Sequence, residues 1–113
     1  MRKQLKVSVI DGPDRGREFV FGDNQPLVIG RGSDSDTKIH DPALSRIHCR
    51  LNVLDRQVVL SDCDSSSGTF VGGLRISSPH ALAHGSVFQI GESVLRIEDE
   101  KNLTRRPCQQ ICR

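Results

Sequence analysis

The sequence predicts an all-β protein, a β-sandwich of two mostly antiparallel sheets. Two observations support this fold class. Many short runs of apolar residues follow one another at close spacing between turn-forming residues, and no long amphipathic helical pattern is present. The 113 residues are enough for one domain with a modest core, and 35% hydrophobic with 27% charged residues are typical of a soluble globular chain.

The first half of the chain begins with a half-buried strand over residues 5–9, where apolar side chains alternate with Lys6 and Ser8. The turn formers in residues 11–16 predict a hairpin into a second strand at 17–21. A short apolar strand follows at 27–29. It delivers the next residues of the chain to a loop tip, a common arrangement for functional side chains.

A polar loop with at most a very short strand at 38–40 leads to residues 48–54, which alternate again. The turn after this strand predicts a hairpin into a further strand at 58–60. Strand character resumes at 69–71, and 74–76 continues it after a turn or bulge.

The remaining elements are a loop and a closing hairpin. Residues 77–85 contain a proline and end on a glycine, so we expect a loop. The runs 87–90 and 94–97 form the last hairpin. From residue 99 the composition is polar, which predicts a domain over 1–98 and a tail or linker over 99–113.

Three segments stand out in the predicted loops: Gly30-Arg31-Gly32, Ser45-Arg46-Ile47-His48, and residues 62–69, which read DCDSSSGT. A phosphate needs a guanidinium for charge-assisted contact and hydroxyl and amide donors around it. Arg31 can supply the first, and the donors can come from Ser45, Arg46, Ser66 and Ser67. Taken one at a time, these serines and glycines are equally explained by the needs of turns. Together they indicate an oxyanion site.

The order and spacing of the three segments resemble the forkhead-associated (FHA) domain, a phosphothreonine-reading module, over about residues 5–98. The resemblance implies a β-sandwich with peptide-binding loops at one end. It also implies a noncatalytic, phosphothreonine-dependent interaction module in Ser/Thr kinase signalling, whose partner is a phosphothreonine-containing protein or peptide. A module of this size is expected to be an adaptor or part of a longer protein.

The resemblance also assigns roles. Arg31 becomes the principal phosphate contact and Ser45 binds the phosphate through its hydroxyl, while a turn-capping role remains the alternative for Ser45. Arg46 assists through its backbone amide and side chain, and Ser66 lies beside the phosphothreonine. The residues expected to support the site are Gly30, His48 and Gly68.

Two positions depart from the family pattern. Ser67 replaces the asparagine that typically holds the peptide main chain, and Gly72 stands where an asparagine is common. A serine offers one hydroxyl instead of an amide donor and a carbonyl acceptor, which predicts weaker or rearranged peptide binding. The alternative function is therefore a phosphate-independent scaffold or oligomerisation module on the same fold.

A hydrolase using Ser67, His48 and Asp62 is the second alternative, and the sequence disfavours it. No strand-turn-helix nucleophile elbow or recognisable triad signature surrounds these serines. We therefore expect no enzyme activity.

Charge and hydropathy exclude other classes. The formal net charge is +2 with scattered basic residues, whereas nucleic-acid binding needs a concentrated positive face. No apolar run approaches the roughly 20 residues of a membrane span, and the first residues lack a signal-peptide core. We expect a cytoplasmic protein that binds neither nucleic acid nor membrane.

No cofactor is indicated, and no metal site is expected. Cys49 is predicted to face the core and Cys63 to be structural, whereas the pair Cys108 and Cys112 lies in the polar tail without a second ligand pair. His80 and His84 are expected in a loop without further ligands. The loop aspartates, read as solvated charges, are Asp34, Asp36 and Asp41.

Overall fold

The computed structural model describes residues 4–22, 25–55 and 57–99, and these ranges contain ten strands. The strands are β1 (Gln4–Asp11), β2 (Glu18–Gly22), β3 (Leu27–Ile29), β4 (Cys49–Leu54), β5 (Gln57–Asp62), β6 (Thr69–Val71), β7 (Leu74–Arg75), β8 (His80–Leu82), β9 (Val87–Ile90) and β10 (Ser93–Asp99).

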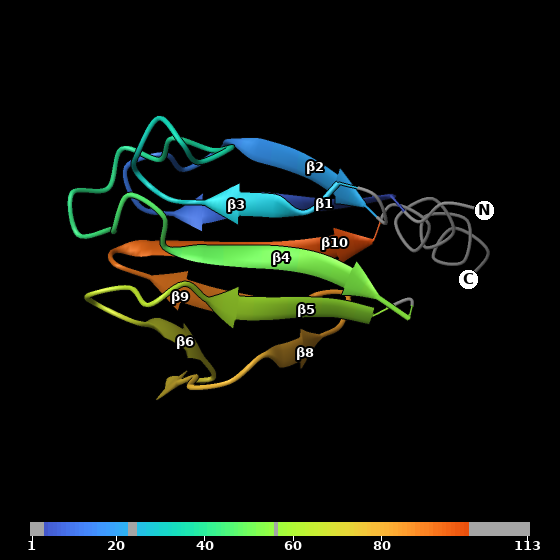
Figure 1. Cartoon of the computed structure of the whole chain (residues 1–113). Helices are drawn as coiled ribbons and strands as arrows, with labels where there is room; N and C mark the ends of the chain where they lie inside the picture. The colour runs from blue at the N-terminus through green and yellow to red at the C-terminus, as the bar shows by residue number, and fades with distance from the viewer. Residues whose placement is uncertain (1–3, 23–24, 56, 100–113) are drawn as a thin grey trace.

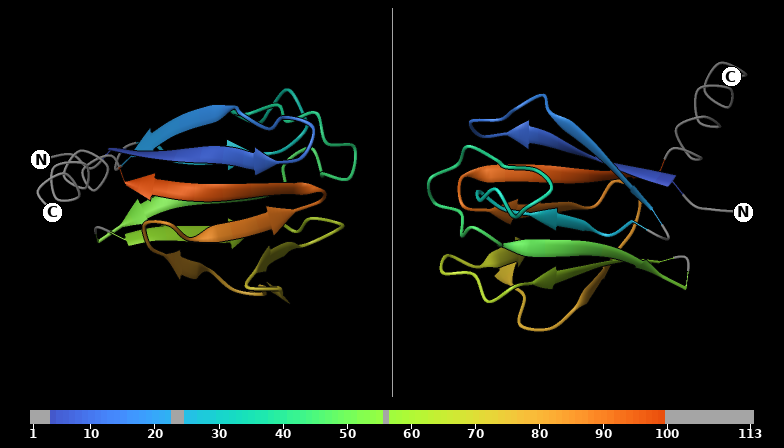
Figure 2. Two further views of the ribbon diagram at one scale, coloured as in Figure 1. Left: turned by 180° about the vertical axis from the view of Figure 1, so that it is seen from behind. Right: turned by 45° about the horizontal axis from the view of Figure 1, so that its top comes forward.

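The strands form two sheets that face each other (Figure 1). Six strands make one sheet in the order β2-β1-β10-β9-β6-β7, and four make the other in the order β3-β4-β5-β8. Neighbouring strands pair antiparallel in both sheets. The predicted β-sandwich is therefore confirmed, and the two views in Figure 2 show its two layers.

The core lies between the sheets and follows the period of two along the strands. Leu5, Val7 and Val9 of β1 are buried, and Cys49 and Leu51 of β4 belong to the same cluster. The expectation that Cys49 packs as a core residue is confirmed, because none of its surface is exposed. Burial raises the pKa of the Cys49 thiol well above its ordinary value.

One predicted element was wrong. Residues 77–85 contain β8, whose Leu82 pairs with Val58 of β5 and is buried, so a core contact overrides the turn-like composition. Pro79 immediately precedes this strand, where its missing N–H costs no ladder bond. For residues 38–40, where at most a very short strand was expected, the structure has no strand, and the buried Ile39 enters the core from a loop.

Four connections meet at one end of the sandwich, on the left in Figure 1. They are the β1–β2 loop (12–17), the β3–β4 loop (30–48), the β5–β6 loop (63–68) and the β9–β10 turn (91–92). We call this the loop end. The β3–β4 loop is the longest of the four, and Ile39 and Leu44 anchor it in the core. All the site residues predicted from the sequence lie at this end.

Candidate phosphate-binding site

The site begins at Gly30, where β3 ends and the backbone passes very close to a later part of the same loop. A Cβ on Gly30 would lie 2.0 Å from the carbonyl oxygen of Arg46, so only glycine allows this approach. The Gly30 N–H donates to Thr37 Oγ1 at 3.2 Å, and its carbonyl accepts from the Ile39 N–H at 2.8 Å. This buried junction fixes the direction in which the chain leaves the sheet.

Arg31 follows directly and is held by two bonds. Its N–H donates to the Ser45 carbonyl at 3.1 Å, and its Nε–H donates to the Leu44 carbonyl at 2.9 Å. The side chain is exposed, and its terminal nitrogens have no partner among the residues that the structure describes. The guanidinium is therefore oriented by the protein while its two NH₂ groups remain available for an anion.

Ser45 and Ser66 bring hydroxyls from two different loops together. The Ser66 N–H donates to Ser45 Oγ at 3.0 Å, and the two hydroxyl oxygens lie 3.4 Å apart. The two residues are 21 positions apart in the sequence, so the fold alone makes this pair. Ser45 is also bonded to Arg31 through its carbonyl, which places guanidinium and hydroxyls in one cluster.

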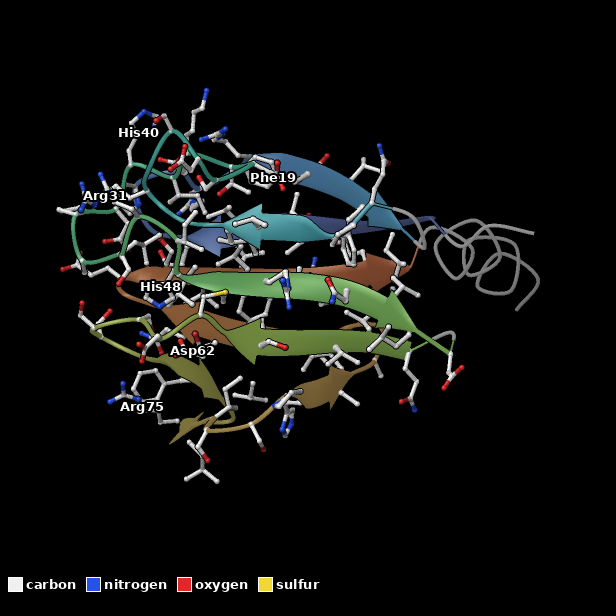
Figure 3. All side chains as sticks on the ribbon, in the orientation of Figure 1. Phe19, Arg31, His40, His48, Asp62 and Arg75 are labelled. Carbon is white, nitrogen blue, oxygen red and sulfur yellow. The ribbon has the colours of Figure 1, made fainter. Side chains whose placement is uncertain are left out.

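His48 joins the same two loops from beneath, and Figure 3 shows it at the base of the loop end. It is fully buried. The Ser45 N–H donates to His48 Nδ1 at 3.2 Å, so Nε2 bears the proton and donates to the Gly68 carbonyl at 2.8 Å. Both ring nitrogens are thus bonded to backbone groups, which makes His48 a positioning residue for Ser45 and Gly68.

Asp62 shapes the β5–β6 loop. Its carboxylate accepts hydrogen bonds from the N–H and hydroxyl of Ser65 and, at 2.7 Å, from the Thr69 hydroxyl. Partial burial alone would raise the pKa of Asp62, but these hydrogen bonds outweigh it and hold that pKa below its ordinary value. The loop closes at Gly68, whose φ of +93° is strained for any residue with a side chain.

Ser67 uses its hydroxyl within the protein. The Oγ–H donates to the Ala43 carbonyl at 2.9 Å, which links the β5–β6 loop to the β3–β4 loop once more. The side chain is exposed and its oxygen can still accept a hydrogen bond. Ser67 therefore offers an incoming peptide an acceptor, while its proton is already in use.

Arg46 lies beside this cluster with an exposed side chain. Its carbonyl accepts from the Gly32 N–H at 3.1 Å, and a Cβ on Gly32 would lie 2.9 Å from the Arg46 Cβ. Arg46 is thus fixed through its backbone while its guanidinium remains at the surface.

The expectation that Asp41 is a solvated loop charge was wrong. Asp41 is fully buried, and its carboxylate accepts from the Glu92 N–H at 2.7 Å, the Ser93 hydroxyl at 2.8 Å and the Ala43 N–H at 2.9 Å. Buried charges persist where hydrogen bonds replace water, as they do here. Asp41 thereby fastens the β3–β4 loop to the β9–β10 turn, a role with no local sequence signal.

A second buried aspartate was also not foreseen. Asp14 in the β1–β2 loop bonds to Arg17 and accepts from the His40 N–H at 3.2 Å. Burial would raise the pKa of Asp14, but the bonds from Arg17 and His40 lower it below its ordinary value. Arg17 also donates to the Thr37 carbonyl at 2.9 Å, so this cluster braces the β3–β4 loop from the opposite side.

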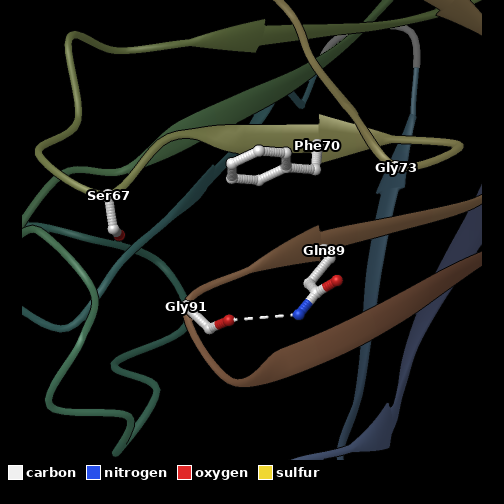
Figure 4. Close-up of a pocket in the computed structure, with 5 residues that line it drawn as sticks. All are labelled: Ser67, Phe70, Gly73, Gln89 and Gly91. Atoms are coloured by element: carbon white, nitrogen blue, oxygen red, sulfur yellow. Dashed lines mark hydrogen bonds between the residues drawn. The ribbon is translucent and has the colours of Figure 1, made fainter.

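A surface hollow of about 310 Å³ adjoins Ser67 (Figure 4). Phe70, Gly73, Gln89 and Gly91 complete its lining, and Gln89 lies 3.4 Å from the Gly91 carbonyl through its amide nitrogen. Phe70 gives the hollow an aromatic wall. Gly73 and Gly91 have no side chains, so the backbone of a bound peptide could approach the hollow closely at these two positions. Sequence reasoning missed it because its walls come from two segments, 67–73 and 89–91, that only the pairing of β6 with β9 brings together.

The hydrolase alternative required Ser67, His48 and Asp62 to bond to one another. Each bonds elsewhere, and in the described part of the chain no hydrogen bond joins any two of them. The arrangement therefore lacks the nucleophile-base contact that such chemistry needs.

Across residues 4–22, 25–55 and 57–99, no group of three or more His, Cys, Asp or Glu side chains could hold a metal ion. His80 lies on β8 and not in a loop, contrary to expectation. Cys108 and Cys112 lie outside the described residues. In the same ranges, no helix is long and apolar enough to cross a membrane.

Comparisons of this chain with a family model and with known proteins indicate the same family. The family model of the FHA domain matches residues 27–91, more than half of the chain. The chain is 33% identical over 96 residues to the proliferation marker protein Ki-67 of Homo sapiens, covering 85% of this chain and 3% of that protein. It is 28% identical over 92 residues to FhaB of Mycolicibacterium smegmatis, covering 81% of this chain and 59% of that protein. The chain thus spans only part of each of these relatives.

Solved structures agree. One comes from a structural and functional analysis of phosphothreonine-dependent FHA domain interactions; its TM-score is 0.74 at 26% identity, covering 84% of this chain and 95% of that chain. The FhaA FHA domain complexed with the intracellular domain of Rv3910 gives a TM-score of 0.73 at 26% identity, covering 83% of this chain and 99% of that chain. FHA domains are interaction modules, and no enzyme family is indicated. This chain belongs to the FHA domain family.

Proposed function

We propose that this chain binds a phosphothreonine-containing segment of a partner protein, without catalysis, in a Ser/Thr kinase pathway of the cytoplasm. The observation that best supports this proposal is how the Arg31 guanidinium is held. Its guanidinium is anchored through Nε to the Leu44 carbonyl, and its terminal nitrogens have no partner in the described residues. An oriented arginine with free donors beside hydroxyl groups is suited to a phosphate dianion.

The phosphate would lie between Arg31 and the hydroxyls of Ser45 and Ser66. Arg31 supplies charge and two donors, and the serine hydroxyls can each rotate a proton toward a phosphate oxygen. Arg46 adds positive charge from its exposed side chain. Because these groups are already held in place by backbone bonds, binding the phosphate requires little ordering of the loops.

The peptide would continue past Ser67 into the hollow beside it. Ser67 Oγ can accept a hydrogen bond from a peptide N–H, and Phe70 offers an apolar wall for one side chain. This single acceptor predicts weaker main-chain binding than an asparagine would give, because the serine proton is bonded to Ala43. Preference for phosphothreonine over phosphoserine is supported by the phosphothreonine-dependent interactions studied for one structural relative.

The boundaries we propose are a phosphopeptide-binding domain over residues 1–98, with 99–113 as tail or linker. A truncation ending at residue 99, where β10 ends, tests this boundary. It should retain the thermal stability and binding of the full chain. Loss of either would place part of the tail in the domain.

The function is tested by titrating degenerate peptide pools that contain phosphothreonine, phosphoserine or unphosphorylated threonine against wild type, Arg31→Ala and Arg50→Ala. Arg50 is an exposed arginine on the outer face of the four-stranded sheet, so its variant controls for the loss of one positive charge. We expect saturable binding only to the phosphothreonine pool, lost in Arg31→Ala and retained in Arg50→Ala. Equal binding of all three pools would instead favour a phosphate-independent interaction module.

A further inference from the structure

Arg75 is a charged residue near the loop end that the proposed phosphate site does not use. It ends β7, the two-residue strand at the edge of the six-stranded sheet. Its side chain is exposed, and within the described ranges it has neither an ion pair nor a hydrogen bond. Figure 3 shows Arg75 and Arg31 toward the same end of the sandwich, with Arg31 in the β3–β4 loop and Arg75 on β7.

The Arg75 side chain is placed against the β5–β6 loop. A Cβ on Gly68 would lie 2.7 Å from Arg75 Nε and 3.1 Å from both Cδ and Cζ. The guanidinium therefore rests directly on the Gly68 backbone, the residue whose carbonyl accepts the His48 bond. Arg75 and His48 thus contact the same short loop, and the phosphate-site hydroxyl of Ser66 lies two residues before Gly68.

Arg75 also adjoins the hollow beside Ser67. It pairs directly with Phe70 across β6 and β7, and side chains of paired residues point to the same face of a sheet. Phe70 forms a wall of the hollow, together with Ser67 and Gly73. A peptide that leaves the phosphate site through this hollow would pass the Arg75 guanidinium.

Neither acidic residue around the β5–β6 loop pairs with Arg75 in the described structure. Asp62 accepts hydrogen bonds from Ser65 and Thr69, and Asp62 and Asp64 both line a different hollow. An arginine that is exposed, positioned by packing and unpaired in the described structure is well suited to bind an anion from outside.

We propose that Arg75 forms a second anion-binding subsite, which selects phosphothreonine peptides that have a further acidic group near the phosphothreonine. This inference rests on the proposed function. The group is an anionic oxygen group, supplied either by an Asp or Glu side chain or by a second phosphorylated residue. Each extended residue advances about 3.4 Å, so the acidic group is sought at each position flanking the phosphothreonine in turn.

The test uses a set of peptides that share one phosphothreonine and place a single Asp, or a single phosphoserine, at each neighbouring position in turn. The reference peptide is uncharged at those positions. Wild type, Arg75→Ala, Arg75→Lys and Arg75→Glu are titrated with each peptide, together with the control Arg50→Ala. Thermal unfolding of each variant checks that it folds.

For wild type we expect the best Asp peptide to bind about two- to fivefold more tightly than the reference, in the range of an exposed charge pair. The phosphoserine peptide should exceed it if the natural source is a phosphate. Arg75→Ala should abolish this preference while the reference peptide changes by less than about twofold. Arg75→Lys should retain part of the preference, Arg75→Glu should reverse it, and Arg50→Ala should leave it intact.

The two hypotheses fail separately. If phosphothreonine peptides bind and Arg31→Ala abolishes binding, but acidic peptides keep their advantage in Arg75→Ala or never show one, the subsite is refuted and the proposed function stands. If Arg75→Ala weakens all peptides equally, Arg75 contributes general attraction and no selectivity, which also refutes the subsite. If no phosphorylated peptide binds to wild type, both are refuted.

Discussion

Replacing Gly30 with alanine should test whether the close backbone contact beneath Arg31 holds the loop end together. The new Cβ would lie 2.0 Å from the Arg46 carbonyl oxygen, whereas real Cβ contacts essentially never fall below 3.0 Å, so the backbones must separate by at least about 1 Å. Such a shift stretches the bonds from Gly32 N–H to Arg46 and from Arg31 N–H to Ser45, each now 3.1 Å. Neither partner is a flexible side chain that could move aside.

The expected loss of stability follows from two contributions. Overpacking of a tight site costs about 1–3 kcal/mol, and two weakened backbone bonds add about 1 kcal/mol each. The sum is about 3–5 kcal/mol, a large part of the stability of a small domain. Urea unfolding of wild type and Gly30→Ala, monitored by circular dichroism, measures it, and Tm should fall by more than about 10 °C.

The control is Gly85→Ala, in a loop after β8. Gly85 has a φ of +87°, and a Cβ there would meet nothing within 4 Å, so only backbone strain of about 1–2 kcal/mol is expected. A Gly30→Ala protein within about 1 kcal/mol of wild type, or no less stable than Gly85→Ala, would refute the reasoning that this contact is rigid.

Three further predictions concern the polar groups of the loop end. Asp41→Ala leaves buried donors without an acceptor and should cost about 3–5 kcal/mol in urea unfolding, and a loss below about 1 kcal/mol would contradict the structural role of Asp41. Because the folded-state pKa of Asp62 lies below the ordinary 3.8, its stabilisation is fully present above that pH and is lost as pH falls through the folded value. Stability measured from pH 6 to pH 2 should therefore fall more steeply in wild type than in Asp62→Asn, and parallel curves would show that this carboxylate is not responsible. Ser67→Asn should bind phosphothreonine peptides about three- to tenfold more tightly, since an amide adds a donor and an acceptor, and unchanged or weaker binding would mean that the bond to Ala43 matters more.

Much of the fold could be predicted from the sequence because burial alternates along the strands. The alternation at residues 5–9 and 48–54 reflects one face packed in the core, and both became strands of the predicted kind. The strand β8 escaped prediction because its three residues are too few for a pattern and follow a proline. Its place depends on Leu82 reaching the core opposite Val58, which only the folded sheet shows.

The candidate site was likewise predicted only in part from the sequence. The candidate residues could be named from three short motifs, but their contacts join positions far apart in sequence, such as Ser45 with Ser66. Asp41 looked like a solvated charge because its partners Glu92 and Ser93 lie more than 50 residues away. Arg75 had no motif at all, because its relation to the site arises from packing on Gly68.

Three polar residues hold the loops around the phosphate site, the buried Asp41 and His48 and the partly buried Asp62. Asp41, His48 and Asp62 each bind the backbone of their own or a neighbouring loop, so the groups around Arg31 are positioned before any ligand arrives. Positioned donors gain affinity because little conformational entropy is lost on binding. The peptide main chain has no comparable support, since Ser67 offers only an acceptor. Under the proposed function, phosphate recognition would therefore be the stronger part of the interaction. Selectivity among phosphopeptides would depend on contacts outside the phosphate site, such as the proposed contact with Arg75.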